Sequence, residues 1–210
     1  SFPVLSTIQD DVPQMKNAYR RVIKTTIFPT FVLTIGIAAC APTMILCLIG
    51  EKWLPSAGYL RIICLYAMMH PLHALNLNAI QVMGRSDLTF RLKIIKTFLV
   101  IIPLTLGYFF GMYAMLLGSL GESYFAFYLN TLYSKSLLNY GIWEQIKDIL
   151  PPLGIALIIA VPVFFMNYLP FSPYILFPLQ IIVGGLLMLT ICEIVKPDAY
   201  MELKSIILRK

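Results

Sequence analysis

The sequence predicts an all-α, polytopic membrane protein with six transmembrane helices, and three observations support this prediction. The first is composition: 59% of the 210 residues are hydrophobic and 12% are charged, whereas about a quarter of the residues in a soluble domain are charged. The second is the presence of long uncharged segments. Four of them exceed the about 20 helical residues that cross a bilayer core: residues 25–50, 62–84, 97–121 and 149–192.

The N-terminal part of the chain is expected to lie on the cytoplasmic side and to lead into two spans. Residues 1–26 read as the end of a preceding helix followed by a basic linker on the lipid headgroups. The first span, residues 27–50, ends at GEKWLP, residues 50–55. In that motif the glycine can end a helix, the tryptophan suits the membrane interface and the proline can open a helix. The second span then covers residues 58–83.

The third uncharged segment is expected to hold two short spans, residues 92–109 and 111–133, which gives four helices within residues 27–133. GYFFG, residues 107–111, lies near the middle of residues 97–134, where Glu122 is the one charged residue before Lys135, and a glycine at each of its ends fits a tight hairpin. The same two glycines could instead form a GxxxG helix-packing face. The distribution of Lys and Arg favours the hairpin.

The C-terminal part is expected to hold an amphipathic cytoplasmic linker, residues 134–148, and two additional spans within residues 149–195. The last uncharged segment has 44 residues and must fold back on itself, and NYLPFSPY supplies two prolines and polar residues for that turn. The resulting spans are residues 149–168 and 173–195, followed by a cytoplasmic tail at residues 196–210.

The third observation is the alternation of Lys and Arg between the two sides of the membrane. Short cytoplasmic segments are enriched in these residues. With six spans, fourteen of the sixteen Lys and Arg fall on one side, and only Lys52 and Arg61 fall on the other. Both ends are therefore expected to be cytoplasmic. The net charge of +6 then reflects topology and anionic headgroups, and no nucleic-acid partner is expected.

The second predicted span carries several polar side chains at membrane depth. At 100° per residue, five of them fall within an arc of roughly 140°: Tyr66, His70, His73, Asn78 and Gln81. Asn76 falls off this arc. Lipid exposure of such a face would be costly, so the arc is expected to face other helices or water. Pro71 removes a backbone hydrogen bond midway, as in the bent helices that line transporter cavities.

Two interpretations of this polar arc remain open. The side chains could hold helices together by hydrogen bonds, or they could line a cavity that contacts a polar substrate or a coupling ion. His70 and Glu122 are the candidates for ion coupling, although Glu122 could equally be a neutral, hydrogen-bonded acid. Arg61 lies near the start of its span, where it is expected to extend its charge to the interface.

The sequence lacks the motifs of common enzymes and metal sites. No G-x-x-x-x-G-K-[ST], G-x-S-x-G, H-E-x-x-H or paired-carboxylate arrangement occurs, so neither catalysis nor a cofactor is expected. The four cysteines have no CxxC spacing and are expected to be small buried residues, not metal ligands.

Three motifs, in this order and separation, resemble a known family of transporters. They are FPVLSTIQDD at residues 2–11, GEKWLP at residues 50–55 and MGRSDLTFRLKIIK at residues 83–96. They are similar to the lipopolysaccharide and exopolysaccharide flippases of the bacterial multidrug/oligosaccharidyl-lipid/polysaccharide exporter superfamily. The chain, which opens at Ser1 without an initiator Met, is then expected to be the C-terminal lobe plus two extra helices of such a protein.

The resemblance implies a function and a location in the bacterial inner membrane. Such proteins move an undecaprenyl-pyrophosphate-linked oligosaccharide across the membrane by alternating access, using a cavity between an N-terminal and a C-terminal lobe. The implied partners are that lipid-linked oligosaccharide, the bilayer, the N-terminal lobe and the polysaccharide polymerase machinery. Gly84, Arg85 and Asp87 match the family's Gly-Arg-Ser/Thr-Asp turn, which would shape a cytoplasmic gate or simply cap a loop with an ion pair. A drug/cation antiporter and a purely structural membrane bundle are the alternatives.

Overall fold

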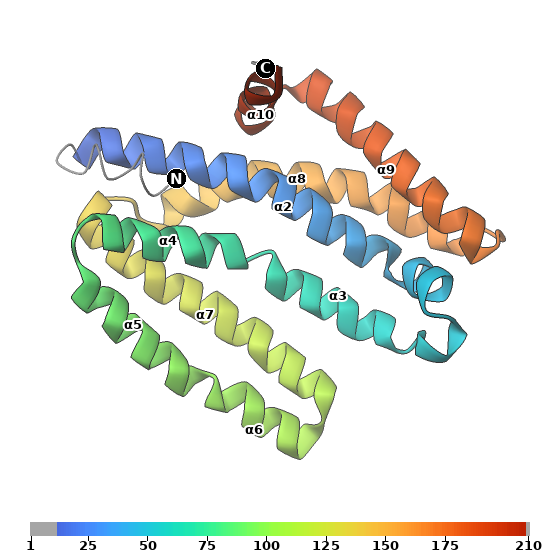
Figure 1. Cartoon of the computed structure of the whole chain (residues 1–210), viewed down its shortest axis with the longest axis horizontal. Coiled ribbons are helices and arrows are strands. Elements are labelled where there is room, and N and C mark those ends of the chain that lie inside the picture. The colour runs from blue at the N-terminus through green and yellow to red at the C-terminus, as the bar shows by residue number, and fades with distance from the viewer. Residues whose placement is uncertain (1–11, 209–210) are drawn as a thin grey trace. The chain divides into compact units, whose positions relative to one another are not determined.

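The computed structural model describes residues 12–208, and within that range the chain is all-α with no strand (Figure 1). The motif FPVLSTIQDD, at residues 2–11, lies outside the described residues. The chain divides into two compact units. Of the described residues, unit 1 contains 12–27 and 69–150, and unit 2 contains 28–68 and 151–208.

Unit 1 contains the first part of helix α2 and four further helices, completed by the start of α8. The bounds are α2 Val12–Leu48, α4 His70–Val82, α5 Ser86–Leu99, α6 Ile101–Phe110, α7 Met112–Leu138 and α8 Ile142–Phe165. Ile80, Leu88 and Leu92 form a buried cluster between α4 and α5, against which residues of α7 pack. This cluster gives unit 1 an apolar core built from α4, α5 and α7.

The backbone of α2 is helical from Val12, whereas the sequence suggested a headgroup linker up to residue 26. One face of this segment is an apolar stripe with a four-residue spacing, and all of its members are fully buried: Met15, Tyr19, Ile23 and Ile27. Residues four apart lie on the same face of a helix. Lys16, Arg20 and Lys24 each follow a buried member of the stripe and are half-buried, so the segment packs within unit 1 through both an apolar and a basic face.

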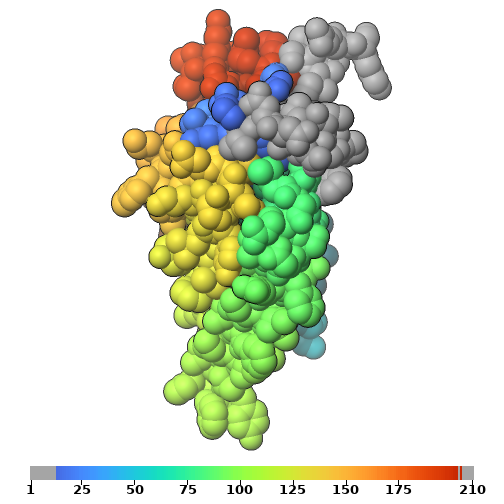
Figure 2. Space-filling view, turned by 90° about the vertical axis from the view of Figure 1, so that its left-hand side faces the viewer, coloured from blue at the N-terminus to red at the C-terminus, as the bar shows by residue number. Residues whose placement is uncertain are grey.

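The hairpin expected at GYFFG is confirmed, with its turn at the second glycine. α6 continues through Gly107 to Phe110, and Gly111 makes the turn with φ of 83°, a conformation that favours glycine. Gly107 and Gly118 then allow α6 and α7 to approach closely: a Cβ on Gly107 would lie 2.9 Å from the Met115 Cβ. The tip of this hairpin is the light green end of the surface in Figure 2.

Unit 2 contains the second part of α2, the helix α3 (Ser56–Ala67), most of α8, and the helices α9 (Pro173–Val195) and α10 (Asp198–Leu208). Short 3-10 helices, η1 (Glu51–Trp53) and η2 (Met166–Tyr168), lie in the α2–α3 and α8–α9 connections. The fold-back expected at NYLPFSPY is confirmed, because η2 and the start of α9 form it. A buried cluster joins α2, α8, α9 and α10: Phe28, Ile155, Ile159, Cys192 and Ala199.

The second predicted span is broken in two. α3 ends at Ala67 and α4 begins at His70, with Pro71 in its first turn. A proline cannot donate to the carbonyl four residues earlier and its ring collides with that carbonyl. For Pro71 that carbonyl belongs to Ala67, the last residue of α3. The break therefore coincides with the carbonyl that Pro71 leaves without a helical partner.

Four helical segments are long and apolar enough to cross a membrane: Pro13–Leu48, Ser86–Phe110, Ile142–Tyr168 and Pro173–Val195. The sequence suggested two more. One of these is the broken α3–α4 segment, and the other is α7, which is long but carries Glu122 and several buried hydroxyl and amide side chains. The described part of the chain is thus a multi-span membrane fold with four spans identifiable by length and composition.

Close packing of the α6–α7 hairpin leads to a testable stability difference. A Cβ on Gly118 would lie 3.1 Å from the Pro103 Cα, whereas a Cβ on Gly121 of the same helix would meet nothing within 4 Å. We expect Gly118→Leu to destabilise the protein by about 1–3 kcal/mol, as overpacking does, and to lower the midpoint of thermal unfolding in detergent. Gly121→Leu is the control and should leave that midpoint unchanged. Equal midpoints for the two variants would contradict the close approach of α6 and α7.

Candidate functional site

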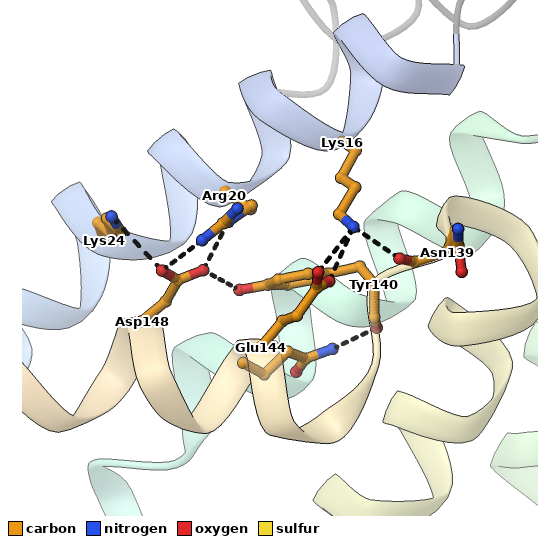
Figure 3. A network of polar contacts seen from close by, with 8 residues as sticks. Lys16, Arg20, Lys24, Asn139, Tyr140, Glu144 and Asp148 are labelled. Atoms are coloured by element: carbon orange, nitrogen blue, oxygen red, sulfur yellow. Dashed lines mark hydrogen bonds and ion pairs between the residues drawn. The ribbon is translucent and has the colours of Figure 1, made fainter.

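The ends of α2 and α8 that lie in unit 1 are joined by a cluster of charges around Asp148 (Figure 3). Arg20 binds Asp148 with two hydrogen bonds, from Nε to Oδ2 at 2.7 Å and from Nη2 to Oδ1 at 2.9 Å. Lys24 Nζ lies 3.4 Å from Oδ1, and the Tyr140 hydroxyl donates to Oδ2 at 2.7 Å. The Asp148 side chain is only 5% exposed. Its negative charge is therefore compensated by two cations and a phenol.

Tyr140, in the connection between α7 and α8, is fully buried beneath this cluster. Burial, together with its hydrogen bond to Asp148, raises the pKa of the Tyr140 phenol well above its ordinary value. The Arg20 guanidinium and the Lys16 ammonium lie 5.8 Å and 5.9 Å from the centre of its ring. Both cations therefore lie within cation–π distance of the ring.

Lys16 closes the other end of the cluster. Its Nζ donates to the Asn139 carbonyl at 2.7 Å and to Glu144 Oε1 at 3.0 Å. Asn139 ends α7 in the left-handed conformation, with φ of 50°, and Glu144 lies in the first turn of α8. A cation at a helix C-terminus and an anion at a helix N-terminus are both favourable for the helix dipole. Lys16 therefore fixes the junction between α7 and α8 against α2.

A second set of polar residues, which we call the polar hub, is fully buried next to these charges. Asn76 Oδ1 accepts from the Tyr19 hydroxyl at 2.9 Å and from the Ser134 hydroxyl at 2.7 Å. Asn76 Nδ2 lies 3.5 Å from Gln145 Oε1, which also accepts from the Thr131 hydroxyl at 3.2 Å. The hub thereby links α2, α4, α7 and α8. Its members are Tyr19, Asn76, Thr131, Ser134 and Gln145.

His73, a member of the predicted polar arc, contacts α7. His73 Nε2 lies 2.9 Å from the Ser123 hydroxyl, and Nδ1 lies 3.2 Å from the Asn130 amide nitrogen. Each ring nitrogen donates or accepts according to the tautomer of the imidazole. His73 is therefore positioned by α7 through both ring nitrogens.

The remaining arc residues lie elsewhere. His70 and Gln81 are exposed and Asn78 is half-buried on α4, whereas Tyr66 is half-buried on α3 and belongs to unit 2. The opposite side of α4 is the buried one and carries Leu72, Leu75, Asn76, Ala79, Ile80 and Val82. The arc of α4 thus turns largely away from the core of unit 1. Whether it lines a cavity stays a prediction.

Asn76 lies off the predicted arc and is not among the predicted site residues. A signal was nevertheless available: Asn76 is the polar member of an otherwise apolar helix face, and a buried amide must find hydrogen-bond partners. Those partners could not be named from the sequence, because Tyr19 and Ser134 lie 57 and 58 residues away.

Glu122 and the turn at Gly84, Arg85 and Asp87 are the other predicted site residues. Glu122 is half-buried on α7. Arg85 and Asp87 form an exposed pair, with Nε 3.0 Å from Oδ1 and Nη2 3.1 Å from Oδ2. Gly84 precedes this pair with φ of 73°. The turn is therefore ordered by a local ion pair, and its role as a gate stays a prediction.

These features define a multi-pass α-helical membrane protein in which buried charges and amides are paired at one end of unit 1. Residues 1–58 match a family model described as polysaccharide biosynthesis protein. This match indicates a role in polysaccharide synthesis or export, and it includes Lys16, Arg20 and Lys24. Comparison with curated proteins and with solved structures gave no match.

The difference in burial between the two acids of the charge cluster can be tested. Asp148→Asn leaves Arg20 without its buried counter-charge, and we expect a loss of about 3 kcal/mol in the free energy of unfolding. Glu144→Gln removes a carboxylate whose side chain is 43% exposed, so the loss should stay below about 1 kcal/mol. SDS titration followed by circular dichroism measures both. A larger loss for Glu144→Gln than for Asp148→Asn would be evidence against Asp148 as the centre of the cluster.

Proposed function

We propose that this chain is part of a transporter that flips undecaprenyl-pyrophosphate-linked oligosaccharide across the bacterial inner membrane for surface polysaccharide synthesis. The observation that carries this proposal is the match of residues 1–58 to a polysaccharide biosynthesis family in a chain rich in membrane-spanning helices. Lipid-linked sugars are made on one side of a membrane and used on the other, so a multi-span protein of polysaccharide synthesis suits their transfer.

The proposed topology has six spans with both ends cytoplasmic. The broken α3–α4 segment counts as one span and α7 as another, in addition to the four long apolar helices. This arrangement places the charge cluster of unit 1 on the cytoplasmic side, in keeping with the enrichment of Lys and Arg there. The N-terminal lobe and the polysaccharide polymerase machinery would be the protein partners.

The proposed transport path includes the polar arc of α4. His70 and Gln81 are exposed and Asn78 is half-buried, and polar side chains facing hydrocarbon are costly. A hydrated cavity wall in contact with the sugar headgroup removes that cost. His73 would extend the wall and is already held in a fixed orientation by α7. Tyr66, in unit 2, is a candidate from the sequence alone.

Alternating access requires parts that stay rigid and parts that move. The polar hub and the Asp148 cluster tie α2, α4, α7 and α8 together and would serve as the rigid part. The break between Ala67 and His70 is the candidate hinge, because the backbone hydrogen bonds are interrupted there. Gly84, Arg85 and Asp87 would form the cytoplasmic gate, and Glu122 or His70 would couple an ion gradient to the movement.

A drug/cation antiporter of the same superfamily is the second candidate. The half-buried Glu122 carboxylate on α7 favours it, because such a carboxylate can exchange a proton for a cationic drug. Loss of drug resistance without loss of surface polymer on Glu122→Gln would select this alternative.

Two asparagines of α4 provide a matched test of the transport path. In the full-length parent protein, introduced into a strain that lacks its polysaccharide flippase, we expect Asn78→Ala to keep the protein level but reduce surface polymer at least about tenfold, as for a lost substrate contact. Asn76→Ala should lower the protein level itself, because it removes the centre of the buried hub. Surface polymer and membrane protein are quantified in the same cells.

The same assay extends to His70→Ala, Gln81→Ala and Arg85→Ala. Normal polymer with all of these variants and with Asn78→Ala would remove the arc and the gate from the transport path. Reduced protein for every variant would instead support the purely structural bundle.

A further inference from the structure

Arg61 is a cation inside the apolar part of unit 2. It lies on α3, five residues after the helix begins at Ser56, and therefore about 7.5 Å along the helix axis from the α2–α3 connection. Trp53, which is 52% exposed in that connection, has the amphipathic ring typical of a membrane interface. Arg61 is thus within side-chain reach of the headgroup region.

The position of Arg61 is explained by a proline on the neighbouring helix. Pro42 lies inside α2 and has no N–H to give to the carbonyl of Ala38, four residues earlier. Arg61 Nε lies 3.3 Å from this carbonyl oxygen and donates to it. One edge of the guanidinium is therefore used to satisfy a backbone group that the helix itself cannot satisfy.

The rest of the guanidinium packs against an aromatic ring. The Arg61 Cζ lies 5.3 Å from the centre of the Phe164 ring. Within residues 12–208 the structure gives Arg61 these two partners and no carboxylate. A ring face attracts the cation but does not neutralise it, and the Nη groups retain their hydrogen-bonding capacity.

Arg61 also lines an open cavity of about 320 Å³ on unit 2 whose other walls are apolar. The walls come from α2, α3 and α8 and include Leu65, Leu157 and Phe165. Leu157 is 47% exposed and Phe165 is 62% exposed. The cavity therefore combines one uncompensated cation with an apolar surface that opens outward from the helices.

We propose that this cavity binds a phospholipid, with the lipid phosphate paired to the Arg61 guanidinium and an acyl chain against Leu157 and Phe165. Charge complementarity carries the choice of ligand, since the planar guanidinium fork matches phosphate oxygens in a bidentate geometry. An anionic headgroup such as that of phosphatidylglycerol is preferred over a zwitterionic one. The site belongs to unit 2 and does not depend on the proposed transport function.

The test uses the purified protein and native mass spectrometry to count retained lipids. Wild-type protein should retain phosphatidylglycerol with higher affinity than phosphatidylcholine. Arg61→Gln should weaken phosphatidylglycerol binding roughly tenfold, as expected for loss of a charge-assisted bidentate pair. Gln can still donate to the Ala38 carbonyl, so the fold is retained. Arg61→Lys keeps the charge without the fork and should give an intermediate affinity.

Two controls separate this site from a general effect of positive charge. Arg91→Gln removes an exposed arginine from α5 in unit 1 and should leave the affinity unchanged. Leu157→Trp fills the apolar part of the cavity without touching the charge, and it should reduce phosphatidylglycerol binding while the thermal midpoint without lipid stays the same. Equal losses for Arg61→Gln and Arg91→Gln would overturn the proposal.

The source of the phosphate is tested with millimolar inorganic phosphate in place of lipid. Since the acyl chain contributes through the apolar walls, inorganic phosphate should not raise the thermal midpoint of the wild-type protein. If it raises the midpoint as much as phosphatidylglycerol does, and Arg61→Gln abolishes that effect, the cavity is a site for free anions and the lipid proposal is wrong.

Discussion

The hydrogen bonds of the Asn76 side chain are the interaction on which the arrangement of unit 1 depends. Its oxygen accepts from helices α2 and α7, and its nitrogen faces Gln145 of α8. An amide without partners in a region from which water is excluded would cost several times the worth of one hydrogen bond. These helices therefore cannot slide past one another without leaving buried polar groups unpaired. The Asp148 charge cluster also joins α2 to α8, and it fixes these two helices in the same relative position along their axes.

Two prolines, Pro71 and Pro42, each leave a backbone carbonyl without its usual partner in the helix. Pro71 leaves the carbonyl of Ala67, and the helix ends there. Pro42 leaves the carbonyl of Ala38, Arg61 donates to that oxygen, and α2 continues to Leu48. The two prolines therefore differ in outcome: α3 ends before Pro71, whereas α2 continues through Pro42.

The sequence was sufficient for features that depend on local chemistry. The uncharged segments, the turn at Gly111 and the interruption at Pro71 follow from residue lengths, a glycine and a proline. The contacts of the polar residues did not follow, because helical periodicity groups side chains by direction but does not say which direction is buried. His70 and Asn76 illustrate this, since the residue chosen from the arc is exposed and the one set aside is buried. Arg20 and Asp148 are 128 residues apart, and nothing local to either one identifies the other.

That separation has a consequence for the order of events during synthesis. At about 5–20 residues per second, a ribosome needs on the order of ten seconds to extend the chain from Arg20 to Asp148. During this interval Arg20 and Lys24 have emerged, but the carboxylate that compensates them has not. Anionic headgroups are the available counter-charge in that period, so the nascent segment would rest on the bilayer surface as a basic amphipathic stretch. Its transfer from headgroups to Asp148 would then mark the moment at which α8 joins the earlier helices.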